Sequence, residues 1–188
     1  MRYAFLASFL ASCSAGPPPA AVTSDLDYDR RDWRHWTDAD GDCQDARQEV
    51  LIRQSEVPVS FEDGRECRVA SGRWTCPYTG EVLTDPSALD VDHVVSLREA
   101  HDTGGAGWDA ARREAFANDL DSPELAAVTA SSNRSKGSRG PEEWMPPDPS
   151  GRCRYLRARV TVQLRWGLAI PEPEARHALR LLVEECSQ

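Results

Sequence analysis

The chain has 188 residues, of which 40% are hydrophobic and 28% are charged, and its formal net charge is −9. This length suffices for one domain with a hydrophobic core, and the composition excludes a disordered polymer and a bundle of membrane helices. The net charge also excludes attachment to nucleic acid by bulk attraction, so such a partner requires a local basic patch. Residues 134–165 provide one, with 8 basic and 3 acidic residues, whereas residues 25–66 hold 6 basic and 13 acidic ones.

The N-terminus predicts export. Arg2 precedes a short apolar run over residues 3–11, which is typical of a signal peptide and too short to span a bilayer. The run leads into Leu-Ala-Ser-Cys, which resembles the bacterial lipobox, whose cysteine becomes the lipidated first residue. We therefore expect a lipoprotein-type signal over residues 1–12 and lipidation at Cys13. An ordinary secretory signal, cleaved a few residues later, is the alternative.

The expected location is the cell surface or the extracellular space, with a lipid anchor as the sole membrane contact. The Gly/Pro-rich stretch 16–21 indicates a linker. We expect this linker to cover residues 13–31 and one folded domain to cover residues 32–188.

Export makes structural disulfides the default role of the cysteines. Five remain after Cys13, an odd number, so one thiol is unpaired or pairs outside the chain. None of them forms a close CxxC pair, which makes a zinc cluster unexpected. We predict the pairs Cys43–Cys67 and Cys153–Cys186 with Cys76 left over, although the sequence alone leaves other connectivities open.

Periodicity and turn residues predict a small α+β domain without internal repeats. In chain order, we expect a helix over 43–54 capped by Asp42, short β pieces within the turn-rich segment 57–84, a strand over 89–97, a helix over 108–117, a strand over 125–129, a helix entering Asn133 capped by Ser131 or Ser132, and closing helices over 156–166 and 172–186.

The strand over 89–97 carries the residues best suited to chemistry. Its alternation places Val91 and His93 on one face and Asp90 and Asp92 on the other. A carboxylate is a hard ligand for a divalent cation, and an imidazole can accept a proton near neutral pH. Read alone, an Asp-His pair is more often a surface or N-cap feature, so its meaning depends on the residues downstream.

Those residues are Asn118 before the next strand and Asn133-x-x-Lys136-Gly at a helix start. Together with Asp92-His93 they resemble the ββα-metal motif of HNH nucleases, and more narrowly the secreted HNH proteins related to the nuclease half of GmrSD-type restriction enzymes. The resemblance covers roughly residues 43–186, and its motifs are specific only as a set. The stretches that carry it are DVDHVVSLREAHDTGGAGWDAARREAFAND, SSNRSKG, PEEWMPP and RCRYLRARVTVQLRWGL.

The resemblance implies an α+β fold with an HNH ββα-metal core, flanking helices and disulfides. It implies that His93 is the general base, that Asp92 and Asn133 bind one divalent metal, and that Asn118 orients the histidine and fixes the turn. The metal would be Mg²⁺, with Mn²⁺ as the alternative. Lys136 would offer its ammonium to the phosphate. Further phosphate contacts are expected from Arg134 and Arg139.

Departures and simpler interpretations accompany these assignments. Ser96 stands where many HNH proteins carry proline, and an asparagine ligand is neutral, which weakens metal binding. Asn118 can be a plain turn residue, and Asn133 with Lys136 can be the start of a solvated helix. The remaining histidines are expected at the surface: His35, His101 and His177.

The segment Asp38-Ala-Asp-Gly-Asp suggests a calcium loop. Numbered from Asp38, however, Gly41 falls at the fourth position and Cys43 at the sixth, where an EF-hand loop needs glycine. A polar turn before the first helix is therefore the expected structure.

The implied function is that of an exported, monomeric HNH-type endonuclease, a hydrolase that cuts phosphodiester bonds in DNA, with RNA as the alternative substrate. Contact with the nucleic-acid backbone implies little sequence preference. Two other classes remain open. One is a surface module with this fold that binds nucleic acid without cutting it, and the other is a cell-envelope structural protein held by disulfides.

Overall fold

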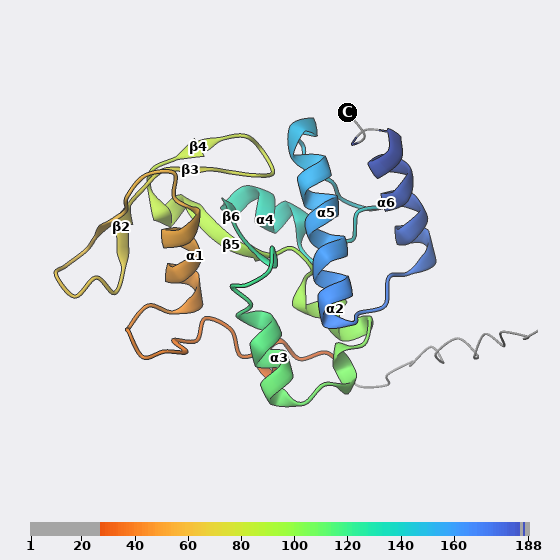
Figure 1. The fold of residues 1–188 in the computed structure, drawn as a ribbon, viewed down its shortest axis with the longest axis horizontal. Coiled ribbons are helices and arrows are strands. Elements are labelled where there is room, and N and C mark those ends of the chain that lie inside the picture. The colour runs from red at the N-terminus through yellow and green to blue at the C-terminus, as the bar shows by residue number, and fades with distance from the viewer. Residues whose placement is uncertain (1–26, 185, 187–188) are drawn as a thin grey trace, which may run out of the picture.

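The computed structural model describes residues 27–184 and 186 (Figure 1). These residues form an α+β fold in which three two-stranded antiparallel sheets lie among helices. The elements are α1 (Ala46–Gln54), β1 (Ser60–Phe61), β2 (Val69–Ser71), β3 (Trp74–Thr75), β4 (Val82–Leu83), β5 (Leu89–His93), α2 (Leu97–Asp102), α3 (Ala110–Ala117), β6 (Leu125–Thr129), α4 (Ala130–Lys136), α5 (Pro149–Trp166) and α6 (Glu172–Glu184). Short 3-10 helices cover Arg30–Asp32, Pro86–Ala88 and Gly105–Gly107.

The sheets pair β1 with β2, β3 with β4 and β5 with β6. The first two are hairpins beside α1, whereas the β5–β6 pair lies at the centre with α4 next to it (Figure 1). The long helix α5 crosses the molecule beside this centre, and α6 packs on its outer side. Within residues 27–184, no helix is long and apolar enough to cross a membrane.

Two helix starts differ from the sequence-based expectation. Helix α1 begins at Ala46 and is capped by Asp45, whose Oδ1 accepts a hydrogen bond from the Gln48 amide at 2.9 Å. Cys43 lies outside the helix because its φ of 76° is in the left-handed region. Helix α4 is capped by Thr129 rather than by a serine of its own first turn.

The expected strand over 89–97 is shorter in the structure. It ends at His93, and α2 begins at Leu97 after the cap residue Ser96, whose Oγ accepts from the Glu99 amide at 3.1 Å. Val94, Val95 and Leu97 are buried. Because a buried turn and a buried strand are equally apolar, the sequence did not show that the strand ends at His93.

Both predicted disulfides are confirmed. Cys43–Cys67 links the loop before α1 to the loop between β1 and β2, and Cys153–Cys186 links α5 to the chain after α6. Among the cysteines of the described residues, Cys76 is the free, buried thiol. Its Sγ accepts a hydrogen bond from the amide of Thr129 at 3.3 Å, so it packs against the start of α4.

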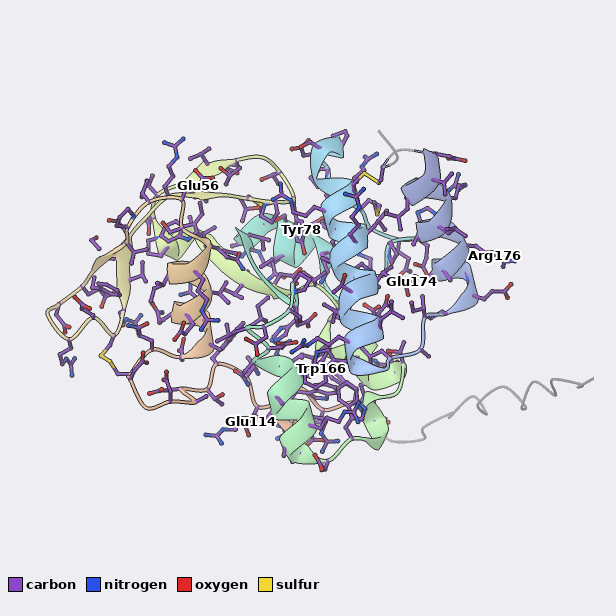
Figure 2. The ribbon with its side chains drawn as sticks, viewed as in Figure 1. Glu56, Tyr78, Glu114, Trp166, Glu174 and Arg176 are labelled. Carbon is purple, nitrogen blue, oxygen red and sulfur yellow. A yellow bond between two sulfur atoms is a disulfide. The ribbon has the colours of Figure 1, made fainter. Side chains whose placement is uncertain are left out.

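The C-terminal helices are held by a buried ionic cluster. Arg159 of α5 forms ion pairs with Glu99 of α2 and Glu174 of α6, and Gln163 donates to Glu174 at 3.0 Å. Figure 2 shows Glu174 on the side of α6 that faces α5. Arg159 is 1% exposed, so this arginine of the basic C-terminal region holds helices together.

The folded part begins ahead of residue 32. Tyr28 packs edge-on against the ring of His101 at 5.5 Å, and Trp33 is fully buried against Phe116. His101 is itself buried, contrary to the expected surface position. The predicted signal peptide, Cys13 and most of the predicted linker lie outside the described residues.

Candidate active site

The candidate site is built on β5, β6 and α4, an antiparallel strand pair followed by a helix (Figure 1). His93 is the last residue of β5. Asp90 and Asp92 point to the side of β5 that α4 covers. The Asn133 amide Nδ2 donates to Asp90 Oδ2 at 3.0 Å, and Lys136 Nζ donates to Asp92 Oδ1 at 2.9 Å. Asn133 and Lys136 are three residues apart and lie on one face of α4, and they contact Asp90 and Asp92, which are two residues apart on one face of β5.

Asp92 is 5% exposed, and both of its oxygens accept hydrogen bonds. Lys136 binds Oδ1, and the Tyr78 hydroxyl donates to Oδ2 at 2.7 Å. Tyr78 lies in the middle of the molecule (Figure 2). Burial raises the pKa of the Asp92 carboxyl, and the neighbouring Lys136 ammonium and Tyr78 hydroxyl oppose that rise.

The expected role of Lys136 is corrected by its position. The side chain is fully buried, and besides Asp92 its ammonium donates to the His93 carbonyl at 2.8 Å. A buried ammonium engaged with protein groups cannot meet a phosphate at the surface. Lys136 instead offsets the charge of Asp92 and fixes the end of β5.

His93 is held as a neutral base. Its Nε2 lies 2.9 Å from the Ala117 carbonyl, which only accepts hydrogen bonds, so Nε2 carries the proton and Nδ1 keeps its lone pair. Desolvation lowers the pKa of His93 to about 3, against the opposing hydrogen bond to Ala117. The ring is therefore neutral at neutral pH, and Nδ1 is its free acceptor atom.

Asn118, which was expected to orient this histidine and to fix the turn, makes its side-chain hydrogen bonds to other groups. Among the described residues, its Oδ1 accepts from the Thr37 amide at 3.0 Å, and its Nδ2 donates to the Arg34 carbonyl at 2.9 Å and to a carbonyl of α3. Asn118 ends α3, and the direct bond to His93 comes from the carbonyl one residue earlier. Its side chain instead anchors a segment near the N-terminus.

This segment, residues 28–37, is here called the strap. Trp36 of the strap stacks on His93 with ring centroids 5.4 Å apart and planes inclined by 28°. The His35 ring lies 6.2 Å from the His93 ring. His35 is half-buried in this group of rings, whereas the sequence suggested a surface residue without a partner.

A cavity of about 500 Å³ opens beside these residues. It brings together Asp92, His93 and Asn133 of the predicted set and adds Arg30 of the strap and Arg98 of α2. The rest of its lining is Tyr28, Val91, Ser96, Leu97, Gly137 and Ser138. The N-terminal strap thus contributes two side chains to a site that the sequence assigned wholly to later residues.

A cavity of similar size, about 540 Å³, lies between β6 and α5. It contains none of the predicted site residues, and its walls are largely apolar, with Leu125 and Tyr155 among them. We therefore take the cavity beside His93, which contains the predicted site residues, as the candidate active site.

Arg134 and Arg139 are exposed and do not line the cavity beside His93. Arg139 donates from Nε to the Lys136 carbonyl at 3.1 Å, which holds its stem against the end of α4. Arg134 lies on α4 next to Asn133, and Arg139 follows the end of that helix.

Glu124 is a residue of this region that the sequence did not single out. It is fully buried just before β6, where its carbonyl accepts from the Val94 amide at 2.7 Å and its Oε2 accepts from the Val95 amide at 3.2 Å. Its Oε1 has no hydrogen-bond partner among the described residues. Desolvation raises the pKa of this carboxyl well above its usual range. Glu124 therefore fixes the turn after His93.

The acidic loop before α1 brings its three carboxylates within 4.8 Å of one another. Their oxygens also accept backbone hydrogen bonds within the loop, as when Asp38 accepts from the Gly41 and Cys43 amides at 2.8 and 3.0 Å. All three side chains are exposed, as in the expected polar turn.

The chain is 36% identical over 159 residues to a protein from the fungus Arthroderma benhamiae that is described as an uncharacterized secreted protein. The alignment covers 85% of this chain and 76% of the fungal protein. The chain belongs to the family of this secreted protein. The relative's description agrees with the export predicted from the N-terminus, and the two disulfides agree with it as well.

No protein-family model matches the chain. No solved structure matches it either. Arguments about function therefore depend on the site itself.

Proposed function

We propose that the chain is an exported, metal-dependent endonuclease of the HNH type that hydrolyses phosphodiester bonds in DNA, with RNA as the alternative substrate. The observation that carries the proposal is the neutral His93 imidazole, which shares a cavity with the oxygen donors of Asp92 and Asn133. Supporting it, these side chains come from a strand pair and a following helix in the order that the ββα-metal resemblance requires.

His93 acts as the general base in this proposal. Its Nδ1 takes a proton from the water that attacks phosphorus, while the Ala117 carbonyl holds the ring by its other nitrogen. Trp36, stacked on the ring, excludes water from one of its faces. The protein thus supplies an oriented base in a cavity that a phosphodiester can enter.

The donor set fits a hard divalent cation such as Mg²⁺ or Mn²⁺. Asp92 and Asn133 offer a carboxylate and an amide oxygen in one cavity, and the Asp90 carboxylate lies beside the Asn133 amide. Each Asp92 oxygen accepts one hydrogen bond and keeps a second lone pair. When bound, a divalent ion would stabilise negative charge on the phosphate during cleavage.

Two guanidinium groups complete the proposed substrate site. Arg30 and Arg98 lie on the cavity wall and can bind non-bridging phosphate oxygens. The exposed Arg134 and Arg139 extend this positive surface along α4 and the residues that follow it. Such contacts read the backbone rather than the bases, so the proposal includes little sequence preference.

Lipid attachment at Cys13 belongs to the same proposal, as does action as a monomer at the cell surface or outside the cell. Mass spectrometry of the mature N-terminus tests the anchor. An acylated cysteine at position 13 supports it, and an unmodified N-terminus further along the chain contradicts it.

The deciding experiment is cleavage of plasmid DNA and of a structured RNA by the purified mature chain with Mg²⁺, with Mn²⁺ and with chelator. We expect metal-dependent cutting by the wild type and a loss of at least about 100-fold in His93→Gln, as for removal of a general base. His177→Ala, on the outer helix α6, is the matched histidine control and should cut normally.

Circular dichroism must first show that all variants are folded. If folded wild type cuts neither DNA nor RNA with any divalent metal, the catalytic proposal fails. Binding of nucleic acid in a gel-shift assay would then favour the non-catalytic binding module, and absence of binding would favour the structural protein.

A further inference from the structure

His35 has one ring nitrogen committed to the protein and one available. Its Nδ1 lies 2.8 Å from the Trp33 carbonyl, which can only accept, so Nδ1 carries a proton and donates it. Within residues 27–184, no hydrogen bond engages Nε2. The ring is half-buried, whereas the His93 ring is buried.

The position of His35 is fixed from both sides. Asn118 binds the carbonyl of Arg34 and the amide of Thr37, which flank His35 and Trp36 in the chain. Between these two anchors, Trp36 stacks on the His93 ring, and His35 contacts that ring edge-on at 80°. Asn118 and the Trp36 ring therefore hold the two imidazoles in one fixed arrangement.

Two imidazoles with centroids 6.2 Å apart suit a reaction that needs both a proton acceptor and a proton donor. In phosphodiester hydrolysis, the attacking water and the leaving oxygen lie on opposite sides of phosphorus. One group must accept the proton of the water, and another must supply a proton to the leaving oxygen. His93 meets the first need, and in the proposed enzyme no other residue has yet been given the second.

We propose that His35 is the second catalytic residue of this site and protonates the leaving oxygen. The inference rests on the proposed nuclease function. Water adds to phosphorus through its oxygen and gives one proton to His93 Nδ1, while the bond from phosphorus to the leaving oxygen breaks. The electron pair of that bond stays on the leaving oxygen, which takes the Nε2 proton of a doubly protonated His35 ring. His35 becomes neutral and keeps its Nδ1 proton on the Trp33 carbonyl. His93 then returns its proton to solvent, and His35 regains one from solvent.

The assignment gives Asn118 a functional reason for its three hydrogen bonds. It is a positioning residue, since it acts on His35 through the backbone of residues 34 and 37. The strap would then supply two parts of the enzyme, a proton donor at His35 and a phosphate contact at Arg30.

The test uses oligonucleotides in which sulfur replaces either the 3′ or the 5′ bridging oxygen of one phosphodiester. A thiolate leaves without being protonated, so these substrates do not need a general acid. His35→Asn is the chosen variant, because its amide can still donate to the Trp33 carbonyl. We expect this variant to lose about 100-fold or more on the ordinary oligonucleotide, the usual effect of a general acid. It should cut one of the two sulfur substrates within threefold of wild type.

Three controls make the outcomes distinct. His93→Gln must lose activity on the ordinary and the sulfur substrates alike, because the base is needed in every case. His177→Ala should match wild type throughout. Melting temperatures show whether each variant is folded.

Two results overturn the inference while leaving the proposed function intact. One is near-normal cutting of the ordinary oligonucleotide by His35→Asn. The other is an equal loss on the ordinary and both sulfur substrates, which would mean that His35 only packs against His93. If the wild type cuts none of these substrates, the proposed function fails and this inference fails with it.

Discussion

The Lys136 ammonium lies 2.9 Å from the Asp92 carboxylate, and neither side chain reaches solvent beyond a few per cent of its surface. The pair links the lysine of the Asn133-x-x-Lys136 spacing to the strand that ends in His93. Removing one partner leaves a buried charge without compensation, which costs far more than loss of an exposed ion pair.

We therefore predict that Lys136→Met lowers the free energy of unfolding by about 3–5 kcal/mol. The double variant Asp92→Asn/Lys136→Met should recover much of that loss, because no charge is then left unpaired. Urea unfolding followed by circular dichroism measures both. Arg53→Met, which breaks an exposed pair with Glu49, should cost less than about 1 kcal/mol and serves as the control. A similarly small effect of Lys136→Met would contradict the buried pair.

The low pKa of His93 predicts acid sensitivity. The folded protein keeps the ring neutral down to a pKa of about 3, whereas the unfolded chain takes up a proton near 6.5. The stability that His93 contributes is thus fully present above pH 6.5 and is lost as the pH falls toward 3. Between pH 7 and pH 5, the wild type should lose about 2 kcal/mol relative to His93→Gln.

Urea midpoints of the two proteins at both pH values give this difference directly. Other buried groups titrate in the same way in both proteins, so the comparison isolates His93. Parallel pH profiles of the two proteins would show that the ring is not buried as described.

Glu124 predicts the opposite pH dependence. Burial raises the pKa of its carboxyl, so the folded state holds a proton that the unfolded chain has released. The associated stability is present below the unfolded pKa and is lost as the pH rises through the folded one. At pH 8, Glu124→Gln should therefore be more stable than wild type by at least about 1 kcal/mol, with little difference at pH 4.

Glu124→Ala separates charge from hydrogen bonding. It removes the acceptor of the buried Val95 amide and should be less stable than Glu124→Gln by about 1–3 kcal/mol at either pH. Stabilities of the Gln and Ala variants that coincide at pH 8 would refute the assigned hydrogen bond.

Asn118 predicts local loosening of the strap. Asn118→Ala removes its bonds to the backbone at residues 34 and 37, so trypsin should cleave after the exposed Arg34 several times faster. N-terminal sequencing of the fragments identifies the cut. Asn133→Ala, which does not touch the strap, is the control. Equal cleavage rates in the two variants would contradict the anchoring role.

The order of elements around the site could be predicted from the sequence because short-range patterns determine it. Alternation marked the strand with Asp92 and His93, the apolar run 125–129 marked β6, and a polar start marked α4. Both disulfides were also predicted correctly. These features depend on residues that are close in the chain or on cysteine chemistry.

The partners of the site residues could not be predicted, because they come from distant segments. The resemblance to HNH proteins implied that Asn118 orients His93, but the sequence does not distinguish an asparagine in a turn from one that binds the backbone at residues 34 and 37. In the sequence, Lys136 is typical of a solvated helix residue, and only the structure shows that it is buried against Asp92. His35 carried no signal except its type, and the aromatic Trp36 beside it was the one available hint of burial.

Because the strap lies at the N-terminal edge of the fold, proteolysis there could inactivate the proposed enzyme irreversibly. A protease that removed residues up to 37 would take away Arg30, His35 and Trp36 in one cut. Both disulfides and the β5–β6–α4 unit lie beyond that point and would stay covalently intact. In an extracellular setting, trimming at this end would end catalysis by the proposed enzyme, and the loss of the buried Trp33 would also destabilise the fold that remains.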